Sequence, residues 1–136
     1  VADELAPLVA QTVAAYRRAG IRVILVAQVP QQQIAVDRVI PWLAYRPPAD
    51  LAALIAASAV PVRASAAFSA AADAALAGAV QPGVTFARFD APFRTGNHFA
   101  WGDGRAAWYT DRSHLSATGA RRLEPAIAAA LDAAMR

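Results

Sequence analysis

The chain has 136 residues, of which 57% are hydrophobic, and a formal net charge of +3. This length and hydrophobic content allow one hydrophobic core, and no stretch reaches the ~20 unbroken apolar residues that a membrane span needs. The absence of cysteine excludes disulfides and thiolate metal sites, and the scattered basic residues, without a run or aromatic interleaving, predict no nucleic-acid binding.

The first part of the chain is predicted to form a helix that leads into a strand. Apolar residues recur there at helical spacing: Leu5, Leu8, Val9, Val13 and Tyr16. Arg17 and Arg18 suit the last turn of this helix, and Gly20 suits the position just after it. The apolar run 21–27 is typical of a buried parallel strand, and the polar, proline-bearing segment 28–48 is predicted to be a long connection.

Two further helices and a second strand are predicted in the middle of the chain. Asp50 is the expected N-cap of the first of these helices, and the second, rich in alanine, covers residues 66–79. A Pro-Gly pair follows and ends it. Residues 84–89 alternate as a strand does, and Asp90 after them is interpreted as a turn residue rather than a site residue.

The C-terminal part is predicted to contain a short strand, 106–109, and a long helix. This helix runs from Ser116 towards Met135, with a kink or a restart near Glu124 because Pro125 falls inside it. Its expected buried residues are Leu123, Ile127, Leu131 and Met135. The alternation of helix and strand along the chain predicts an α/β fold of three layers, with a doubly wound parallel sheet in the flavodoxin manner.

The strongest chemical signal is the segment 108–116, W-Y-T-D-R-S-H-L-S, which lies just ahead of the predicted terminal helix. A carboxylate three residues before an imidazole can turn back to accept the Nδ1 proton, which leaves Nε2 free to take a proton from an alcohol. Ser116 suits the N-cap position of the helix that follows. Asp111 and His114 are therefore the candidate orienting acid and general base.

Other interpretations of the histidines are open. The pattern D-x-x-H is short and common, and a loop histidine ahead of a helix is often a surface or capping residue. His98 could in principle join Asp111 and His114 in a metal site, but no H-x-x-x-H or similar spacing occurs. We interpret His98 as a loop residue that is exposed or hydrogen bonded, and we predict neither a metal nor a cofactor.

The longer pattern around these two residues resembles a known family. From Tyr109 to Ala120 the chain reads Y-x-D-x-x-H-L-S-x-x-G-A, and this resembles the last sequence block of the SGNH (GDSL-type) hydrolases. It is most similar to the SGNH domains fused behind membrane-bound acyltransferases that O-acylate cell-surface polysaccharides. The segment from Gly20 to Pro30 resembles the G-x-x-V-x-L-V-x-x-V-P strand of the same fused domains.

The G-D-S block that carries the nucleophilic serine of this family does not occur in these 136 residues. The serines of the chain are Ser58, Ser65, Ser69, Ser113 and Ser116. The first three lie in an alanine-rich context that is predicted to be helical. We therefore interpret residues 1–136 as the C-terminal portion of one SGNH-like domain, incomplete at its N-terminus, and expect no esterase turnover from this chain alone.

The resemblance implies a serine esterase or O-acyltransferase that acts on acyl esters of cell-surface polysaccharide or similar sugars. Asp111 and His114 are its implied catalytic residues. The implied partners are an acyl-ester or carbohydrate substrate and a membrane-embedded acyltransferase domain of the parent chain. An extracytoplasmic location, on the periplasmic or cell-surface side, follows from the same resemblance.

Two rival hypotheses stay open at this point. In the first, the chain is a non-catalytic binding or scaffold module that retains the SGNH shell. A start codon near Val1 would favour this hypothesis over the esterase or acyltransferase. In the second, the fold is an unrelated α/β fold in which Asp111 and His114 are incidental, and their side chains point apart.

Overall fold

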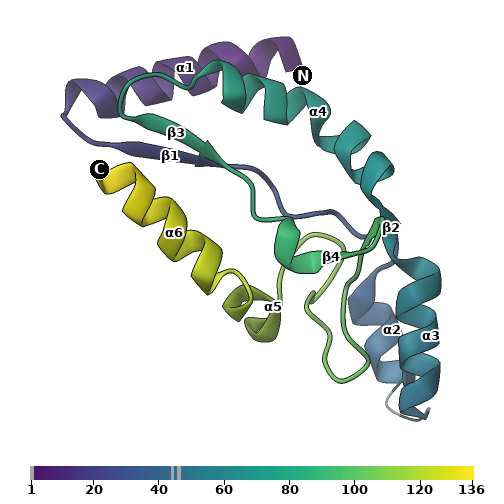
Figure 1. Cartoon of the computed structure of the whole chain (residues 1–136). Coiled ribbons are helices and arrows are strands. Elements are labelled where there is room, and N and C mark those ends of the chain that lie inside the picture. The colour runs from purple at the N-terminus through teal and green to yellow at the C-terminus, as the bar shows by residue number, and fades with distance from the viewer. Residues whose placement is uncertain (1, 44, 46) are drawn as a thin grey trace. The chain divides into compact units, whose positions relative to one another are not determined.

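The computed structural model describes every residue except 1, 44 and 46. Its chain divides into two compact units, and each unit contains one sheet. Figure 1 labels the helices and strands. Unit 1 comprises Val1–Gln28, Ala66–Phe89 and Pro125–Arg136, and unit 2 comprises Val29–Ser65 and Asp90–Glu124.

Unit 1 is built on two parallel strands. β1 pairs with β3, with Val23 opposite Val84 and Val26 opposite Ala87. Val13 of α1 and Val84 of β3 are each 1% exposed and form the centre of this unit's core. Figure 1 shows α1 and α6 on opposite sides of the strand pair. The elements are α1 (Ala2–Arg18), β1 (Val23–Val26), most of α4 (Val62–Gly78), β3 (Val84–Ala87) and α6 (Glu124–Met135).

The end of α1 confirms the predicted role of Gly20. Its φ of +75° lies in the left-handed region that favours glycine, and the N–H of Ile21 donates to the carbonyl of Tyr16 at 3.0 Å. Because Ile21 belongs to this helix end, β1 begins at Val23, two residues later than predicted.

Unit 2 contains a small antiparallel sheet with strand order β2-β5-β4. Its core is aromatic, since Phe93, Trp101 and Tyr109 are all fully buried. The ring Nε1 of Trp101 donates to Ser58 Oγ at 2.9 Å and so links the core to α3. The elements are α2 (Val36–Leu43), α3 (Pro48–Ser58), β2 (Val60–Pro61), η1 (Ala91–Phe93), β4 (Arg94–Thr95), β5 (His98–Phe99) and α5 (Ala117–Arg121).

Three local predictions in unit 2 are wrong. The segment 28–48 is not one long connection, because α2 lies within it and buries Val36 completely. Asp50 lies in the first turn of α3 instead of capping it, since Pro47 holds the N-cap position. The predicted strand 106–109 is replaced by two isolated bridges, Gly102 with Ala107 and Tyr109 with Leu115. By contrast, Asp90 precedes the short helix η1, in agreement with its interpretation as a turn residue.

The C-terminal helix breaks where the proline predicted it would. α5 ends at Arg121 and α6 begins at Glu124, one residue before Pro125. Leu123 is buried as expected, but the prediction that α6 buries its larger apolar side chains is wrong. Their exposed fractions are 39% for Ile127, 49% for Leu131 and 69% for Met135.

The parallel strand pair and the helices beside it give unit 1 an α/β fold. In the described part of the chain, the parallel sheet has two strands and the other sheet is antiparallel. A doubly wound parallel sheet therefore stays a prediction. Among the described residues, no helix is long and apolar enough to cross a membrane.

Gly119 of α5 packs directly against the main chain of Trp108 in unit 2. A Cβ atom at this position would overlap the Trp108 carbonyl oxygen, which is backbone and cannot rotate away. Gly78, at the end of α4, has open space where a Cβ would be placed. The two glycines therefore form a matched pair for substitution.

We expect Gly119→Ala to lower the free energy of unfolding by about 3 kcal/mol, because the added methyl group forces backbone to move. Gly78→Ala should raise it by roughly 0.5 kcal/mol through lower entropy of the unfolded chain. Urea unfolding monitored by tryptophan fluorescence and by circular dichroism measures both effects. Equal stabilities of the two variants would contradict the close contact at Gly119.

Candidate functional site

Asp111 and His114 face each other across a tight turn of unit 2. Nδ1 of His114 lies 2.6 Å from Oδ2 of Asp111. The other carboxylate oxygen, Oδ1, accepts the main-chain N–H of Ser113 at 2.7 Å and that of His114 at 2.8 Å. One carboxylate therefore holds both the backbone of the turn and the ring of the histidine, and the two residues singled out from the sequence lie together.

The turn is closed by main-chain bonds at its base. The N–H of Thr110 donates to the carbonyl of His114 at 2.8 Å, and the Thr110 hydroxyl reaches the same oxygen at 3.2 Å. Tyr109 and Leu115 form a bridge one residue further out. Residues 110–114 are thus a closed loop, which we call the Asp–His turn.

Ser116 joins the Asp–His turn to α5 and confirms its predicted role as N-cap. Its Oγ accepts the N–H of Gly119 at 3.1 Å and donates to the carbonyl of Ala107 at 2.8 Å. Its own N–H donates to the carbonyl of Trp108 at 2.9 Å. The start of α5 is therefore fixed to both residues that precede Tyr109.

The electrostatics of the turn keep Asp111 ionised. The backbone N–H groups of Ser113 and His114, followed by the imidazole of His114, hold the pKa of the Asp111 carboxyl well below its usual range. The His114 side chain is 78% exposed and that of Asp111 is 41% exposed. The imidazole therefore has a charged partner on Nδ1 and an accessible opposite edge.

Three contacts that support this region had no sequence signal. The guanidinium of Arg122 lies 3.8 Å from the ring centroid of Trp108 and donates to the carbonyl of Pro92 at 2.9 Å. The main-chain N–H of Gln32 donates to the carbonyl of Arg112, inside the Asp–His turn, at 2.7 Å. Such contacts join segments far apart in the chain, so periodicity and local motifs do not reveal them.

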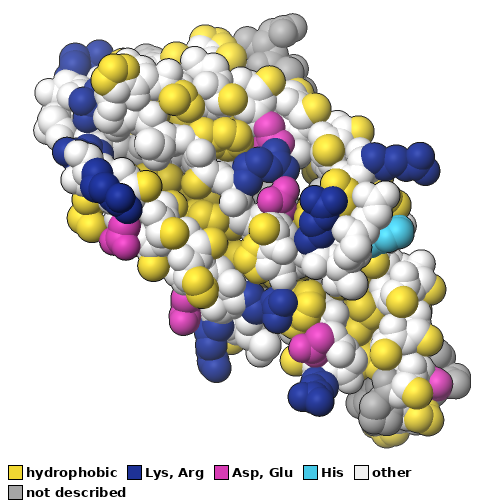
Figure 2. Space-filling model, viewed as in Figure 1, with side chains coloured by type: hydrophobic (Ala, Val, Ile, Leu, Met, Phe, Trp, Pro, Cys, Tyr) yellow, Lys and Arg dark blue, Asp and Glu magenta, His cyan; other side chains and the backbone are white. Residues whose placement is uncertain are grey.

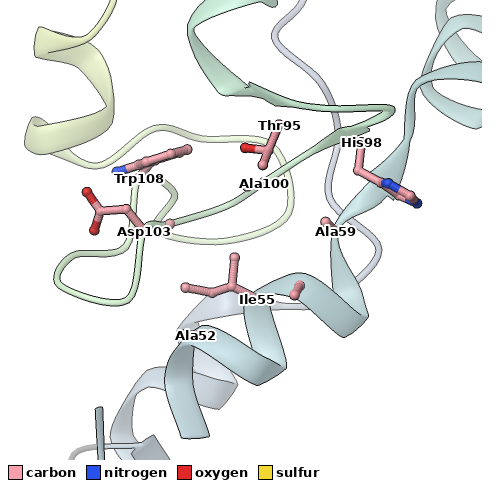
Figure 3. A pocket seen from close by; sticks show the side chains of 10 residues that line it. Ala52, Ile55, Ala59, Thr95, His98, Ala100, Asp103 and Trp108 are labelled. Carbon is pink, nitrogen blue, oxygen red and sulfur yellow. The ribbon is translucent and has the colours of Figure 1, made fainter. Parts of the chain in front are cut away.

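A cavity of about 410 Å³ lies in unit 2, and Trp108 is part of its wall. The lining is mostly apolar, and it includes Ile55 of α3 (Figure 3). Figure 3 shows the Thr95 hydroxyl directed towards the tryptophan and the His98 ring directed away from the cavity. Asp103 lies at the cavity edge, and its pKa is lowered chiefly by the backbone N–H groups of Arg105 and Ala106, which donate to its carboxylate.

The serines of the chain have other roles than pairing with His114. Ser58 donates to Leu54, Ser69 donates to Asp73, and Ser116 is the cap described above. Ser113 Oγ lies 3.4 Å from Asp111 Oδ1. Ser65 lies in α4 and is 8% exposed.

His98 is exposed, as expected, but the interpretation as a loop residue is wrong, because His98 lies on strand β5. Among the described residues, no three His, Cys, Asp or Glu side chains gather as metal ligands do. The structure therefore brings Asp111 and His114 together without His98.

The parallel strand pair flanked by helices places unit 1 in the α/β class, and unit 2 brings an aspartate and a histidine together in one turn ahead of a helix. The family model described as "SGNH domain (fused to AT3 domains)" matches residues 2–129, and the chain belongs to this family. Comparisons with curated proteins and with solved structures gave no significant match.

The low pKa of Asp111 predicts how the turn responds to acid. A carboxyl whose pKa is lower in the folded chain stabilises the fold above its unfolded pKa, and this contribution is lost as the pH falls through the folded value. We expect the amide resonances of Ser113 and His114 to titrate with a midpoint below 3.8, the ordinary value for aspartate.

The measurement is an NMR titration of the labelled chain between neutral pH and the acid limit of folding. Asp111→Asn is the control, because it removes the titrating group and should remove the transition. A midpoint at or above 3.8 would show that the two N–H groups do not stabilise the carboxylate.

Proposed function

We propose that this chain is the C-terminal portion of an SGNH domain that acts as a serine esterase or O-acyltransferase, with His114 as general base and Asp111 as orienting acid. The observation that carries the proposal is the 2.6 Å approach of His114 Nδ1 to Asp111 Oδ2. A carboxylate on Nδ1 favours the tautomer whose Nε2 carries the lone pair, which is the state that a general base needs.

In this proposal the nucleophilic serine lies outside these 136 residues. Nε2 of His114 takes the proton from the serine hydroxyl as its oxygen attacks the acyl carbon of an ester. The imidazolium then gives that proton to the departing alcohol oxygen, and the acyl group stays on the serine. Water or a sugar hydroxyl next attacks the acyl-serine and gives its proton to His114. As the acyl–serine bond breaks, His114 returns that proton to the serine oxygen, and the acyl group leaves as the free acid or the new ester.

Asp111 has an electrostatic role in the same steps. A positive imidazolium forms at His114 during the reaction, two residues before the N-cap of α5. The N-terminus of a helix disfavours positive charge, although α5 is short and the effect is correspondingly small. The Asp111 carboxylate offsets that charge, and its low pKa keeps it ionised when the imidazolium appears.

The exposed apolar side chains of unit 1 support the proposal that this chain is part of a larger α/β layer. Apolar side chains are exposed on α1, at the end of β1 and on α6: Leu8, Tyr16, Val26, Ile127, Leu131 and Met135. Figure 2 shows hydrophobic side chains at the surface over α1 and α6. Parallel sheets are normally covered on both faces and have more than two strands. We propose that further strands of a doubly wound SGNH sheet, from the portion that carries the serine, extend the β1–β3 pair and cover these side chains.

The family description supports the substrate class and the location. Because the matching family is fused to AT3 acyltransferase domains, we propose a membrane-embedded acyltransferase as partner in the parent chain. Acyl esters of cell-surface polysaccharide or related sugars are the proposed substrates, and the extracytoplasmic side of the membrane is the proposed location.

The cavity of unit 2 is a candidate site for the acyl group. Its volume of about 410 Å³ and its apolar lining suit a short acyl chain. Trp108, which lines the cavity, lies two residues before the Asp–His turn in the chain.

The first test of the proposed function compares the chain alone with a protein that includes its upstream coding sequence. The longer protein should hydrolyse p-nitrophenyl acetate, and His114→Ala should lower its kcat by about 10²–10⁴-fold, the usual contribution of a general base. Asp111→Asn should lower kcat with little change in KM, whereas Asp37→Asn, at an exposed position of α2, should change neither.

The chain alone should show no turnover above background. Serine-dependent turnover by these 136 residues would overturn the placement of the nucleophile outside them. Full activity of His114→Ala in the longer protein would overturn the catalytic proposal and favour a binding or scaffold module.

The second test concerns the cavity and uses the chain alone. Titration with ethyl butyrate should shift the NMR signals of the Trp108 ring and the Ile55 methyl groups. Ala56→Phe, which fills the cavity, should abolish these shifts, and Ala57→Phe, on an exposed face of the same helix, should leave them. Shifts that persist in Ala56→Phe would show that the ester binds elsewhere.

A further inference from the structure

The short helix α5 is held by Trp108 at both of its ends. At its start, the N–H of Ser116 donates to the Trp108 carbonyl at 2.9 Å, and Gly119 packs against the same carbonyl. At its end, the guanidinium of Arg122 lies 3.8 Å from the centroid of the Trp108 ring. Trp108 is 5% exposed, so one residue of the buried core fixes both ends of the helix.

Arg122 also binds the main chain of η1. Its Nη2 donates to the Pro92 carbonyl at 2.9 Å, and its Nε donates to the same oxygen at 3.3 Å. The next residue, Phe93, is fully buried, and its ring centroid lies 6.2 Å from that of Trp108 and 5.5 Å from that of Tyr109. One guanidinium therefore joins the end of α5 to the aromatic core that precedes the Asp–His turn.

These contacts determine how the Asp–His turn is connected at both of its ends. The turn starts directly after Tyr109 and ends two residues before Ser116, the N-cap of α5. α5 has only five residues, and a helix of this length is not stable in isolation. Its direction, and with it the exit from the turn, therefore depends on the groups that bind α5 to Trp108.

We infer that Arg122 is a positioning residue for the Asp111–His114 pair, which it orders by holding the end of α5 against Trp108 and Pro92. A guanidinium suits this role because it is planar, so it can stack on an aromatic ring while its N–H groups donate to a carbonyl. The pair needs such support, since the His114 side chain is 78% exposed and an exposed ion pair holds its geometry weakly. The consequence for catalysis rests on the proposed function, whereas the consequence for the geometry of the turn does not.

Arg121 provides a matched control for Arg122. It is the same residue type at the adjacent position and is also exposed. In the part of the chain that the structure describes, its side chain makes none of the contacts that Arg122 makes with Trp108 and Pro92. Arg121→Gln should therefore behave as the wild type, and a difference from Arg122→Gln reports those contacts rather than the loss of a positive charge.

The test uses the 136-residue chain and two readouts. The first is the hydrogen-exchange rate of the Thr110 and Ser116 amides, which bind the two ends of the turn. The Ala27 amide, which bonds to the end of β3 in unit 1, is the internal reference. The second readout is the ¹⁵N shifts of the His114 ring, which report its neutral tautomer.

Arg122→Gln should speed exchange at Thr110 and Ser116 by about tenfold, because it removes a cation–π contact and a charged donor. Exchange at Ala27 should not change, and His114 should populate both neutral tautomers. Arg122→Lys keeps the charge and one donor group, so its exchange rates should fall between those of the wild type and Arg122→Gln. Unchanged exchange in Arg122→Gln, or an equal increase at all three amides, would overturn the inference.

A second measurement uses the wild-type chain and does not depend on how a variant folds. The side-chain protons of Arg122 should be shifted upfield by the ring current of Trp108, because the guanidinium lies over that ring. Side-chain shifts typical of an unstructured arginine would overturn the inference.

In the longer protein, Arg122→Gln should lower kcat by about tenfold with little change in KM, since small displacements of a catalytic pair are costly. A change in KM alone would overturn the catalytic consequence. If the exchange effects appear while His114→Ala leaves activity intact, the proposed function fails and the positioning role of Arg122 in the turn stands.

Discussion

The arrangement of this site depends on one carboxylate. Asp111 binds two backbone N–H groups with Oδ1 and the imidazole Nδ1 with Oδ2, so it orders the main chain and orients the histidine at once. A neutral side chain could accept the same N–H groups, but it would not hold a positive imidazolium. The spacing of three residues between Asp111 and His114 is what allows a single side chain to do both.

The rest of unit 2 gives that turn a rigid base. Ser116 ties the start of α5 to the carbonyls of Ala107 and Trp108, and the absence of a side chain at Gly119 lets the helix approach Trp108 closely. Arg122 then covers the Trp108 ring. These contacts explain why the exposed pair can be ordered: the His114 side chain is 78% exposed, while the backbone on both sides of the turn is bound to a buried aromatic core.

The features that sequence predicted are those set by short-range chemistry. Gly20 after α1, the Ser116 cap, the break before Pro125 and the approach of Asp111 to His114 each involve residues within a few positions of one another. The family was recognised from the block around Asp111 and His114 together with the strand segment 20–30. Predictions failed where a local signal was misleading. Pro41 concealed the helical spacing of α2, and an aspartate near a proline resembled a cap.

The failures on α6 have a different cause, and they bear on the whole fold. Apolar residues at helical spacing predict a buried face, and the spacing on α6 is correct, yet Ile127, Leu131 and Met135 are exposed. The parallel pair β1–β3 shows the same mismatch, since its sequence is that of a covered strand while Val26 is 48% exposed. This mismatch in unit 1 supports the proposal that further strands extend the β1–β3 pair, and those strands are where the proposed nucleophile is to be sought.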